Sequence, residues 1–362
     1  MKIVKAKETM TARERVARTF SYEKTDRVTI GYESNEEINR KLCQALGVTS
    51  QFELLKCLGV DYAGIHPKYN GPSLFPELPD RRRDGQTGAV MRYIPNEYGG
   101  YWDFCDFPLK DAEPEAIASF PCASADDYDY DDVKEQVAFL RKEGFAVHLG
   151  HPGLGDILNT TGMVMGVEDA LVNIATRDEA TLQLIDRRLN RDLAVCERVL
   201  AKNEIDFMWL GEDLGTQHSP IISIELYREV IRPRQQKFID LAKSYNMPVI
   251  IHTCGASSWV YEDFIEMGMS GVDTLQPEAT NMTPKYLTEK FGGRLNFRGC
   301  ISTAGPLAYR TAAETEQVCI KTLEIMKPHR GYHFAPTHAI QDNTPVENII
   351  AMYNAAHKYG VY

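Results

Sequence analysis

Short apolar runs recur along this chain, and longer amphipathic segments separate most of them. A short apolar run predicts a buried strand, whereas apolar positions spaced three and four apart predict a helix that packs on one face. Eight strands are expected on this basis, at residues 26–32, 61–67, 146–151, 206–211, 248–251, 272–277, 295–300 and 331–336. Helices are expected at residues 35–46, 51–58, 133–143, 154–165, 167–203, 224–245, 259–267, 284–291, 312–326 and 346–359.

Eight strands that alternate with helices favour one α/β fold. They predict a parallel (β/α)8 barrel, the TIM barrel, which spans residues 1–362 as a single domain. No G-x-G-x-x-G pattern follows the first strand, so an open dinucleotide-binding sheet is not expected. In barrels of this type the chemistry takes place at the C-terminal ends of the strands.

Residues 68–132 interrupt this alternation between the second and third strands. The segment is rich in proline, glycine, tyrosine and acidic residues, and it shows little helical periodicity. Within it, residues 89–95 and 100–104 are expected to pair as a β-hairpin around residues 96–99. A long insertion in a compact domain is either functional, as a lid or a partner surface, or simply irregular.

Composition and charge exclude several classes of partner. The net charge of −11 argues against a nucleic-acid-binding protein, which needs a basic surface. No apolar run is long enough to span a membrane. The eight cysteines stand singly, and residues 1–20 contain no apolar signal segment, so we expect a cytoplasmic protein with reduced thiols.

The fifth predicted strand runs directly into His252 and Cys254, and Gly255 follows them. Residues two apart on a strand point to the same face, so the imidazole and the thiol can meet at one point. Zinc binds both groups readily. A His-x-Cys pair alone is a weak signal, because a buried cysteine usually packs as a small apolar residue.

A catalytic zinc needs a third protein ligand and one open position. His338 follows the eighth predicted strand and Cys300 ends the seventh, so either side chain can approach the same end of the barrel. Glu212 and Asp213, after the fourth strand, are further candidates. The alternative interpretations are a loop histidine bonded to backbone for His338 and a packed thiol for Cys300.

Glu212, Asp213 and His151 are the candidate catalytic residues. The two carboxylates lie between Gly211 and Gly215, which permit a tight turn at the strand end. Either carboxylate can fix the tautomer of a metal-binding histidine or bind a substrate hydroxyl. His151 ends the third strand. The alternatives are a solvent-facing acidic turn and a structural histidine.

Several motifs together resemble the uroporphyrinogen decarboxylase superfamily over nearly the whole chain. They are TARERV (11–16), DRV (26–28), LGVDY (58–62), GEDLGTQHSPIIS (211–223), YREVIRPR (227–234), VIIHTCG (249–255) and GYHFAPTHAIQDNTPVENI (331–349). Within the superfamily the chain is similar to the zinc-dependent, corrinoid-linked methyltransferase branch, of the O-demethylase or methylcobamide methyltransferase type. True decarboxylases of the family carry an M-R-Q-A-G-R type motif and no metal, and residues 1–62 contain no such motif.

The resemblance implies a metal site. In the methyltransferase branch, the His-x-Cys pair and a cysteine ahead of a C-terminal T-P-x-E-N motif hold zinc. When the chain is aligned on residues 344–348, His338 occupies the position of that cysteine. The resemblance therefore implies His252, Cys254 and His338 as ligands, with Cys300 as the alternative third ligand, unless the metal has been lost.

This ligand set suggests a particular reaction. One thiolate with two imidazoles leaves zinc more electrophilic than two thiolates do, which suits polarisation of an ether oxygen. The hypothesis is a zinc-dependent methyltransferase that demethylates a small methoxylated, aromatic methyl donor and passes the methyl group to cobalt(I) of a corrinoid (cobalamin). No corrinoid-binding D-x-H-x-x-G motif occurs in the chain, so the corrinoid is expected on a separate partner protein.

The candidate contacts for substrate and cofactor are Tyr101 and Trp102 in the insertion and Gln276 at the end of the sixth strand. Two other enzymes remain possible interpretations. One is a corrinoid-to-thiol methyltransferase, and the other is a metal-free decarboxylase that uses an inward-pointing arginine, for which Arg298 is the candidate. A barrel that survives only as a docking subunit is the non-enzymatic alternative. A homodimer is expected from the resemblance alone.

Overall fold

The structure is a computed structural model that describes residues 2–362. Eight parallel strands form its central sheet in the order β1, β13, β12, β11, β10, β9, β8, β2. These strands are β1 (Thr29–Ile30), β2 (Tyr62–Ile65), β8 (Ala146–Gly150), β9 (Phe207–Gly211), β10 (Val249–His252), β11 (Gly271–Leu275), β12 (Asn296–Ile301) and β13 (Tyr332–Pro336). The N–H of Asp61 donates to the carbonyl of Ile30 (2.9 Å) and joins the two end strands. The predicted (β/α)8 barrel is confirmed.

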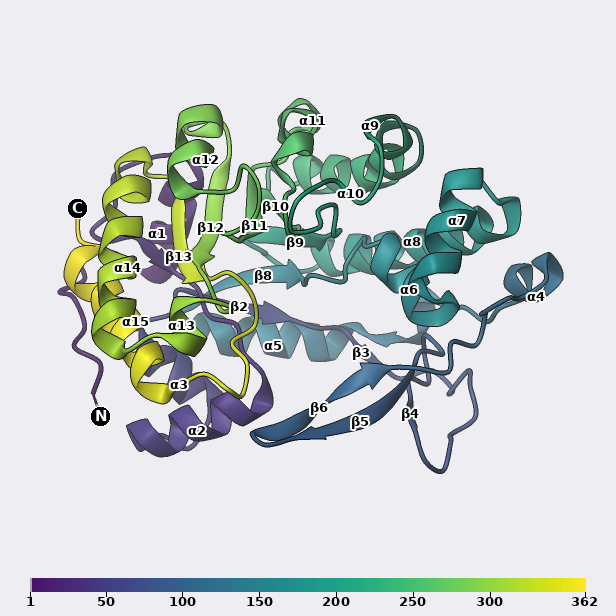
Figure 1. The fold of residues 1–362 in the computed structure, drawn as a ribbon, viewed down its shortest axis with the longest axis horizontal. Helices are drawn as coiled ribbons and strands as arrows, with labels where there is room; N and C mark the ends of the chain where they lie inside the picture. The colour runs from purple at the N-terminus through teal and green to yellow at the C-terminus, as the bar shows by residue number, and fades with distance from the viewer. Residues whose placement is uncertain (1) are drawn as a thin grey trace.

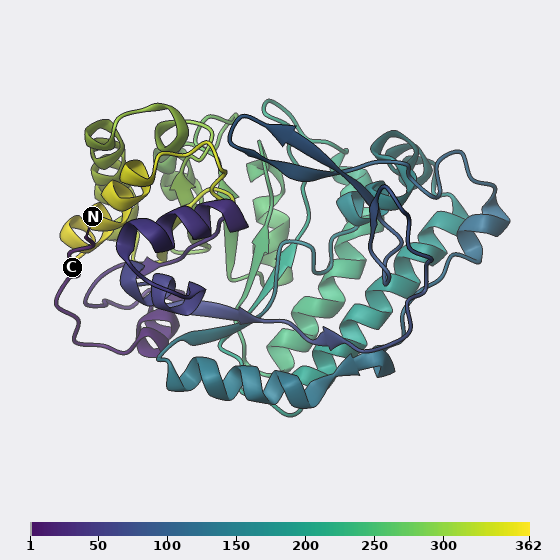
Figure 2. The ribbon, with the colours of Figure 1, turned by 90° about the horizontal axis from the view of Figure 1, so that it is seen from below.

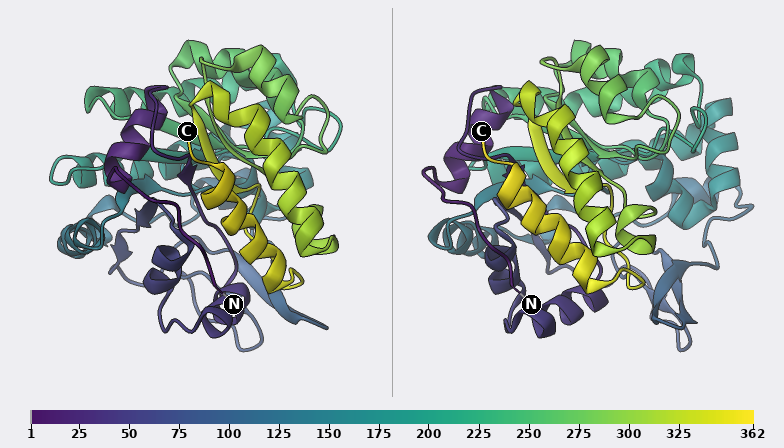
Figure 3. Two further views of the ribbon diagram at one scale, coloured as in Figure 1. Left: turned by 90° about the vertical axis from the view of Figure 1, so that its left-hand side faces the viewer. Right: turned by 60° about the vertical axis from the view of Figure 1, so that its left-hand side comes forward.

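Helices cover the outside of the barrel (Figure 1). They are α1 (Ala12–Phe20), α2 (Glu36–Leu46), α3 (Gln51–Leu58), α5 (Tyr130–Lys142), α6 (Leu158–Met165), α7 (Val167–Thr176), α8 (Glu179–Leu200), α9 (Ile224–Leu226), α10 (Arg232–Ser244), α11 (Tyr261–Met267), α12 (Pro284–Phe291), α13 (Pro306–Tyr309), α14 (Ala312–Met326) and α15 (Val346–Tyr359). Figure 3 shows α14 and α15 side by side near the C-terminus. Within residues 2–362, no helix has both the length and the apolar character that a membrane span requires.

The strands divide their side chains between two cores. Outward-facing side chains such as Met208, Ile251 and Phe297 join the helices in one large apolar core. Inward-facing side chains form a separate small cluster that includes Trp209 and Ile250. Because alternate residues of a strand point to opposite faces, the position of Ile250 places the next inward side chain of β10, that of His252, inside the barrel at its C-terminal end.

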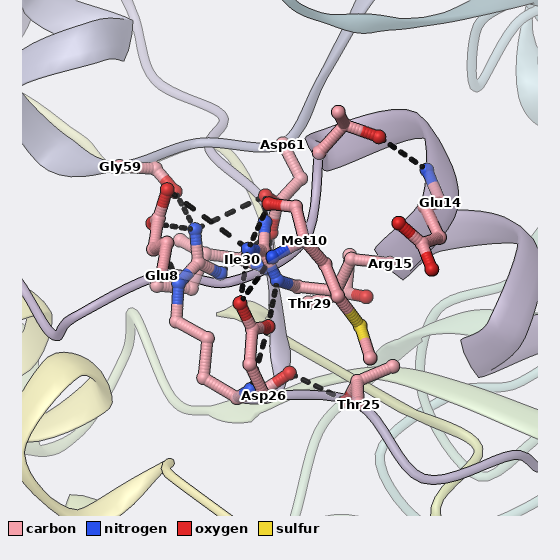
Figure 4. A network of polar contacts seen from close by, with 12 residues as sticks. Glu8, Met10, Glu14, Arg15, Thr25, Asp26, Thr29, Ile30, Gly59 and Asp61 are labelled. Atoms are coloured by element: carbon pink, nitrogen blue, oxygen red, sulfur yellow. Dashed lines mark hydrogen bonds and ion pairs between the residues drawn. The ribbon is translucent and has the colours of Figure 1, made fainter.

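A buried network of charged residues closes the other end of the barrel (Figure 4). Asp61, just before β2, accepts hydrogen bonds from Arg15 (2.5 Å) and Arg27 (2.7 Å). Arg15 also donates to Asp26 (2.7 Å), and Arg27 donates to Glu8 (2.7 Å). Both arginines and Asp61 are buried. Since these charges are paired, the network ties the N-terminal segment and α1 to the starts of β1 and β2.

Two predicted helices are interrupted. The helix expected at residues 167–203 is two helices, α7 and α8, because Arg177 adopts a left-handed conformation (φ 59°) and Asp178 caps α8 by accepting from the N–H of Thr181. The helix expected at residues 224–245 contains a π-helical segment, η2 (Tyr227–Ile231). It lies directly before Pro233, whose missing N–H cannot complete a regular turn.

The insertion contains the predicted β-hairpin. Strands β5 (Val90–Asn96) and β6 (Gly99–Phe104) are antiparallel, and β4 (Arg82–Arg83) pairs with β5. The remaining elements are β3 (Lys68–Tyr69), β7 (Tyr128–Asp129), the short helix α4 (Pro114–Ala118) and a 3-10 turn, η1 (Ala125–Asp127). Figure 2 shows the dark blue hairpin reaching toward the yellow loop that precedes α15. A side chain built on Gly99, at the hairpin tip, would lie 3.9 Å from the carboxylate of Asp342 in that loop.

Candidate metal centre

Three side chains converge at the C-terminal mouth of the barrel. His252 ends β10, Cys254 lies in the loop that follows, and His338 follows β13. One nitrogen of each histidine and the sulfur of Cys254 all lie within 4.8 Å of one another. His252 Nε2 is 3.4 Å from Cys254 Sγ, and the two imidazole rings are 5.5 Å apart between centroids. The structure thus brings together the three residues that the sequence suggested as metal ligands.

The orientation of His252 is set by strand β11. Asp273 Oδ2 lies 3.0 Å from His252 Nδ1, and the hydroxyl of Thr274 lies 2.6 Å from the same nitrogen. Burial alone would lower the pKa of His252, but the hydrogen bond and charge of Asp273 outweigh it and raise the pKa. With Nδ1 engaged, Nε2 is the nitrogen that faces Cys254. A carboxylate on the outer nitrogen is the usual support of a metal-binding histidine.

Asp273 is itself held by a buried arginine. Its Oδ1 accepts from Arg298 (2.5 Å), which also donates to the hydroxyl of Tyr62 (2.8 Å) and lies over the Trp209 ring at 4.3 Å. Burial would raise the pKa of Asp273, but the charge of Arg298 lowers it. Sequence reasoning missed Asp273. An acidic residue in the middle of an otherwise apolar strand was the signal that could have identified it.

The loop that carries Cys254 is fixed by two side chains. Asp213 Oδ1 accepts from the N–H of Cys254 (2.8 Å), and Gln276 Oε1 accepts from the N–H of Gly255 (2.7 Å). Asp213 also lies 3.9 Å from His252 Nε2. Burial, and then the charge of Asp213, raise the pKa of the Cys254 thiol. Asp213 therefore borders the metal centre, whereas the amide oxygen of Gln276, a candidate cofactor contact, is occupied by backbone.

The other two candidate catalytic residues lie elsewhere. The Glu212 carboxylate is buried and accepts from the N–H groups of Ile157 (2.9 Å) and Leu158 (3.0 Å). It caps the start of α6 and does not face the three ligands, because the strand turns its side chain toward the helix. His151 lies at the end of β8, where its Nδ1 accepts from the N–H of Gly153 (3.0 Å).

Cys300 is not part of the group. Within residues 2–362, the cluster of possible ligands contains only His252, Cys254 and His338. Gly299 and Cys300 both have positive φ (117° and 68°), which breaks the alternation of β12, and Cys300 packs in the apolar core between strands and helices. Burial raises the pKa of its thiol. The packed-thiol alternative describes the position of this residue, which lies outside the cluster of possible ligands.

Tyr101 and Trp102 lie on the hairpin β5–β6. Both side chains are exposed, and Trp102 contacts Tyr93 with ring centroids 5.6 Å apart. They make no part of the ligand cluster. As adjacent residues of β6 they point to opposite faces of the hairpin, and Tyr98 at the turn is exposed as well.

Comparisons with known proteins bear on this arrangement. The profile of the uroporphyrinogen decarboxylase family matches residues 166–359, which is more than half of the chain. A solved structure described as a methyltransferase from Methanosarcina mazei superposes with a TM-score of 0.67 at 16% sequence identity, over 96% of this chain and 98% of that one. At this identity the likeness shows the fold. A search of curated proteins gives no match.

Proposed function

Since the chain belongs to the uroporphyrinogen decarboxylase family, we propose that it is a zinc-dependent methyltransferase. It demethylates a small methoxylated, aromatic substrate and passes the methyl group to cobalt(I) of a corrinoid held by a separate protein. The observation that carries this proposal is the His252, Cys254 and His338 cluster at the catalytic end of the barrel. A methyltransferase with the same fold supports it.

The donor set fits zinc. Two imidazole nitrogens and one thiol sulfur are ligands that zinc prefers, and three protein ligands leave one position for a substrate. Asp273 supplies the outer contact to His252 that such sites usually have. A bound zinc would act as a Lewis acid toward the ether oxygen of the substrate.

The protein side chains have distinct tasks in this proposal. Asp273 holds His252 in one tautomer, with Nε2 directed at the site. Asp213 and Gln276 fix the backbone of the Cys254 loop, so that the thiol is positioned before any ligand binds. In the transfer itself the methyl–oxygen bond breaks, the oxygen keeps the electron pair and takes up a proton, and cobalt(I) supplies the pair for the new bond to carbon.

The corrinoid partner must reach the barrel mouth. We propose the exposed hairpin β5–β6, with the aromatic side chains of Tyr98, Tyr101 and Trp102, as its contact. Aromatic residues are enriched at protein interfaces. We place the reaction in the cytoplasm, because the eight cysteines are all free thiols and cobalt(I) needs a reducing compartment.

The competing enzymes fit the geometry less well. A metal-free decarboxylase needs an inward-pointing arginine whose charge is free for the substrate carboxylate, but the charge of the buried Arg298 is paired with Asp273, and its Nε donates to Tyr62. A corrinoid-to-thiol transferase gains from a metal that activates a thiol. One thiolate and two imidazoles suit an oxygen ligand better.

The direct test is a methyl-transfer assay. The zinc-loaded protein is mixed with a reduced corrinoid protein and a panel of methoxyarenes, and the cobalt absorbance is followed. We expect methylation of the corrinoid with at least one methoxyarene, its loss in Cys254→Ala, and its retention in Cys300→Ala, which removes a thiol outside the cluster. Absence of methylation with every methoxyarene, methylamine and methylthiol tested would rule out the proposal.

A further inference from the structure

A cavity of about 540 Å³ lies beside the barrel mouth, between α6, α8 and the insertion. It reaches the ends of β2 and β8, where the rings of His66 and His151 are 5.8 Å apart between centroids. Its size falls in the range of small-molecule sites, about 300–1,000 Å³. Among the described residues that line it, the three side chains of the metal centre are absent.

One wall of the cavity carries a cation that, within residues 2–362, makes no direct ion-pair contact. Arg188, on α8, donates to the carbonyls of Thr160 (3.1 Å) and Thr87 (3.4 Å) and lies over the ring of Phe120 at 5.7 Å. No carboxylate within residues 2–362 is in direct ion-pair contact with it, although the charge of nearby Asp192 acts on it, and burial lowers the pKa of Arg188 to about 10. A buried charge is costly unless it is paired. The guanidinium is therefore suited to an anion that enters the cavity.

The other charges in the cavity define the anion. Arg191, one turn along α8, is already paired with Asp192 (2.7 Å). The charge of Asp192 also acts on Arg188, but Arg188 keeps N–H groups free of any direct carboxylate contact within residues 2–362 and can accept one further negative charge. A phosphate dianion would place excess charge near Asp156 and Asp192, which also line the wall. A planar carboxylate matches the two parallel N–H groups of a guanidinium.

The rest of the wall suits an apolar body. Its apolar members include Ile65, Leu149, Leu154, Ile185, Leu189 and Val195. We propose that the cavity binds a small aromatic or aliphatic monocarboxylate, with its carboxylate on Arg188 and its apolar body against these side chains. The proposal goes beyond the methyl transfer and requires neither zinc nor a corrinoid.

Calorimetric titration of the full chain, without metal or corrinoid, tests this site. The probes are benzoate and 4-methoxybenzoate, with benzamide and 4-methoxybenzamide as neutral analogues of the same shape. We expect each carboxylate to bind at least about tenfold more tightly than its amide, a difference of about 1.4 kcal/mol. Arg188→Gln removes that preference. Arg187→Gln, at the exposed neighbouring position on α8, leaves it unchanged.

A second variant guards against loss of folding. Val195→Phe fills the cavity but keeps Arg188, and it is expected to weaken carboxylate binding at least about tenfold. The melting temperature of ligand-free Arg188→Gln is expected to be unchanged or higher, since an unpaired charge has been removed. Absence of carboxylate binding by the folded wild-type protein at millimolar concentration, or equal affinities in wild type and both variants, would overturn the proposal. Neither result bears on the methyl-transfer assay.

Discussion

The two ends of the barrel each contain a buried network of charges, and the two networks differ in how completely they are paired. At the closed end, both oxygens of Asp61 accept from Arg15 or Arg27, and one also accepts from the N–H of Ile30. At the mouth, Asp273 links Arg298 to His252, yet Arg298 Nη2 has no hydrogen-bond partner within residues 2–362.

The difference separates a structural network from a functional one. At the closed end the charged groups already have protein partners, so none of them is available to bind a ligand. This network instead holds the N-terminal segment on the barrel. At the mouth, a nitrogen of His252, the sulfur of Cys254 and a nitrogen of His338 lie within 4.8 Å of one another, an arrangement that can accept a metal ion. This agrees with the general division of barrels, in which the C-terminal face carries the chemistry.

The largest effect is expected from Asp61→Asn at the closed end. The change leaves Arg15 and Arg27 buried without their shared carboxylate, so the free energy of unfolding should fall by about 3–5 kcal/mol. Denaturant unfolding measures the loss, with Glu14→Gln on the exposed face of α1 as the control. A decrease in the free energy of unfolding of less than about 1 kcal/mol would contradict the structural role assigned to this network.

Cys254→Ser at the mouth should, in contrast, affect zinc binding and leave the stability of the metal-free protein almost unchanged. We expect the metal-free variant to unfold close to wild type, whereas zinc should stabilise only the wild-type protein. At a free zinc concentration about a hundredfold above its Kd, the gain is about 2.7 kcal/mol. Unfolding with and without zinc, in metal-buffered solution, measures both quantities. Equal stabilisation of wild type and variant by zinc would contradict a role for Cys254 in zinc binding at the mouth.

The charge network at the closed end should also contribute less to the free energy of unfolding at acid pH. Burial would raise the pKa of Asp26, but the hydrogen bond and charge of Arg15, and the N–H groups of Thr9 and Met10, hold it well below its usual range. The contribution of the Asp26 carboxylate to the free energy of unfolding is therefore present above pH ~4, and it is lost as the pH falls toward the lowered pKa of Asp26. Asp26→Asn should destabilise by about 2 kcal/mol or less at pH 7, and the difference from wild type should shrink below pH ~4. A difference that does not change with pH would contradict this assignment.

A carboxylate near the mouth should show the reverse pH dependence. Burial raises the pKa of Asp156 to about 6, although its hydrogen bonds to Asn159 and Thr160 oppose this. The folded protein therefore favours the neutral acid, and stability should fall as the pH rises from about 4 to about 6. Asp156→Asn should flatten that slope by about 1 kcal/mol per pH unit. Parallel unfolding curves for wild type and variant between pH 4.5 and 7.5 would contradict it.

The sequence predicted the barrel because short apolar runs and amphipathic helices repeat along the chain. It also predicted that the side chains of His252, Cys254 and His338 converge, since their positions at strand ends determine which side chains meet. It did not predict the break at Arg177, where one left-handed residue and a capping aspartate separate two helices. Nor did it predict that Glu212 caps α6, and it left open whether Cys300 is a ligand or a packed thiol. Glu212 caps α6 and Cys300 turns outward, and both depend on local backbone geometry that residue spacing does not encode.

The metal content of the purified protein is the direct test of the proposed zinc site at His252, Cys254 and His338. Wild type, His338→Ala and Cys300→Ala are purified with zinc, dialysed, and assayed for bound metal by mass spectrometry, with circular dichroism to verify folding. If these three residues bind zinc, we expect about one zinc per chain in wild type and in Cys300→Ala, and almost none in His338→Ala. Stoichiometric zinc in folded His338→Ala, or its loss in Cys300→Ala, would contradict the His252, Cys254 and His338 site.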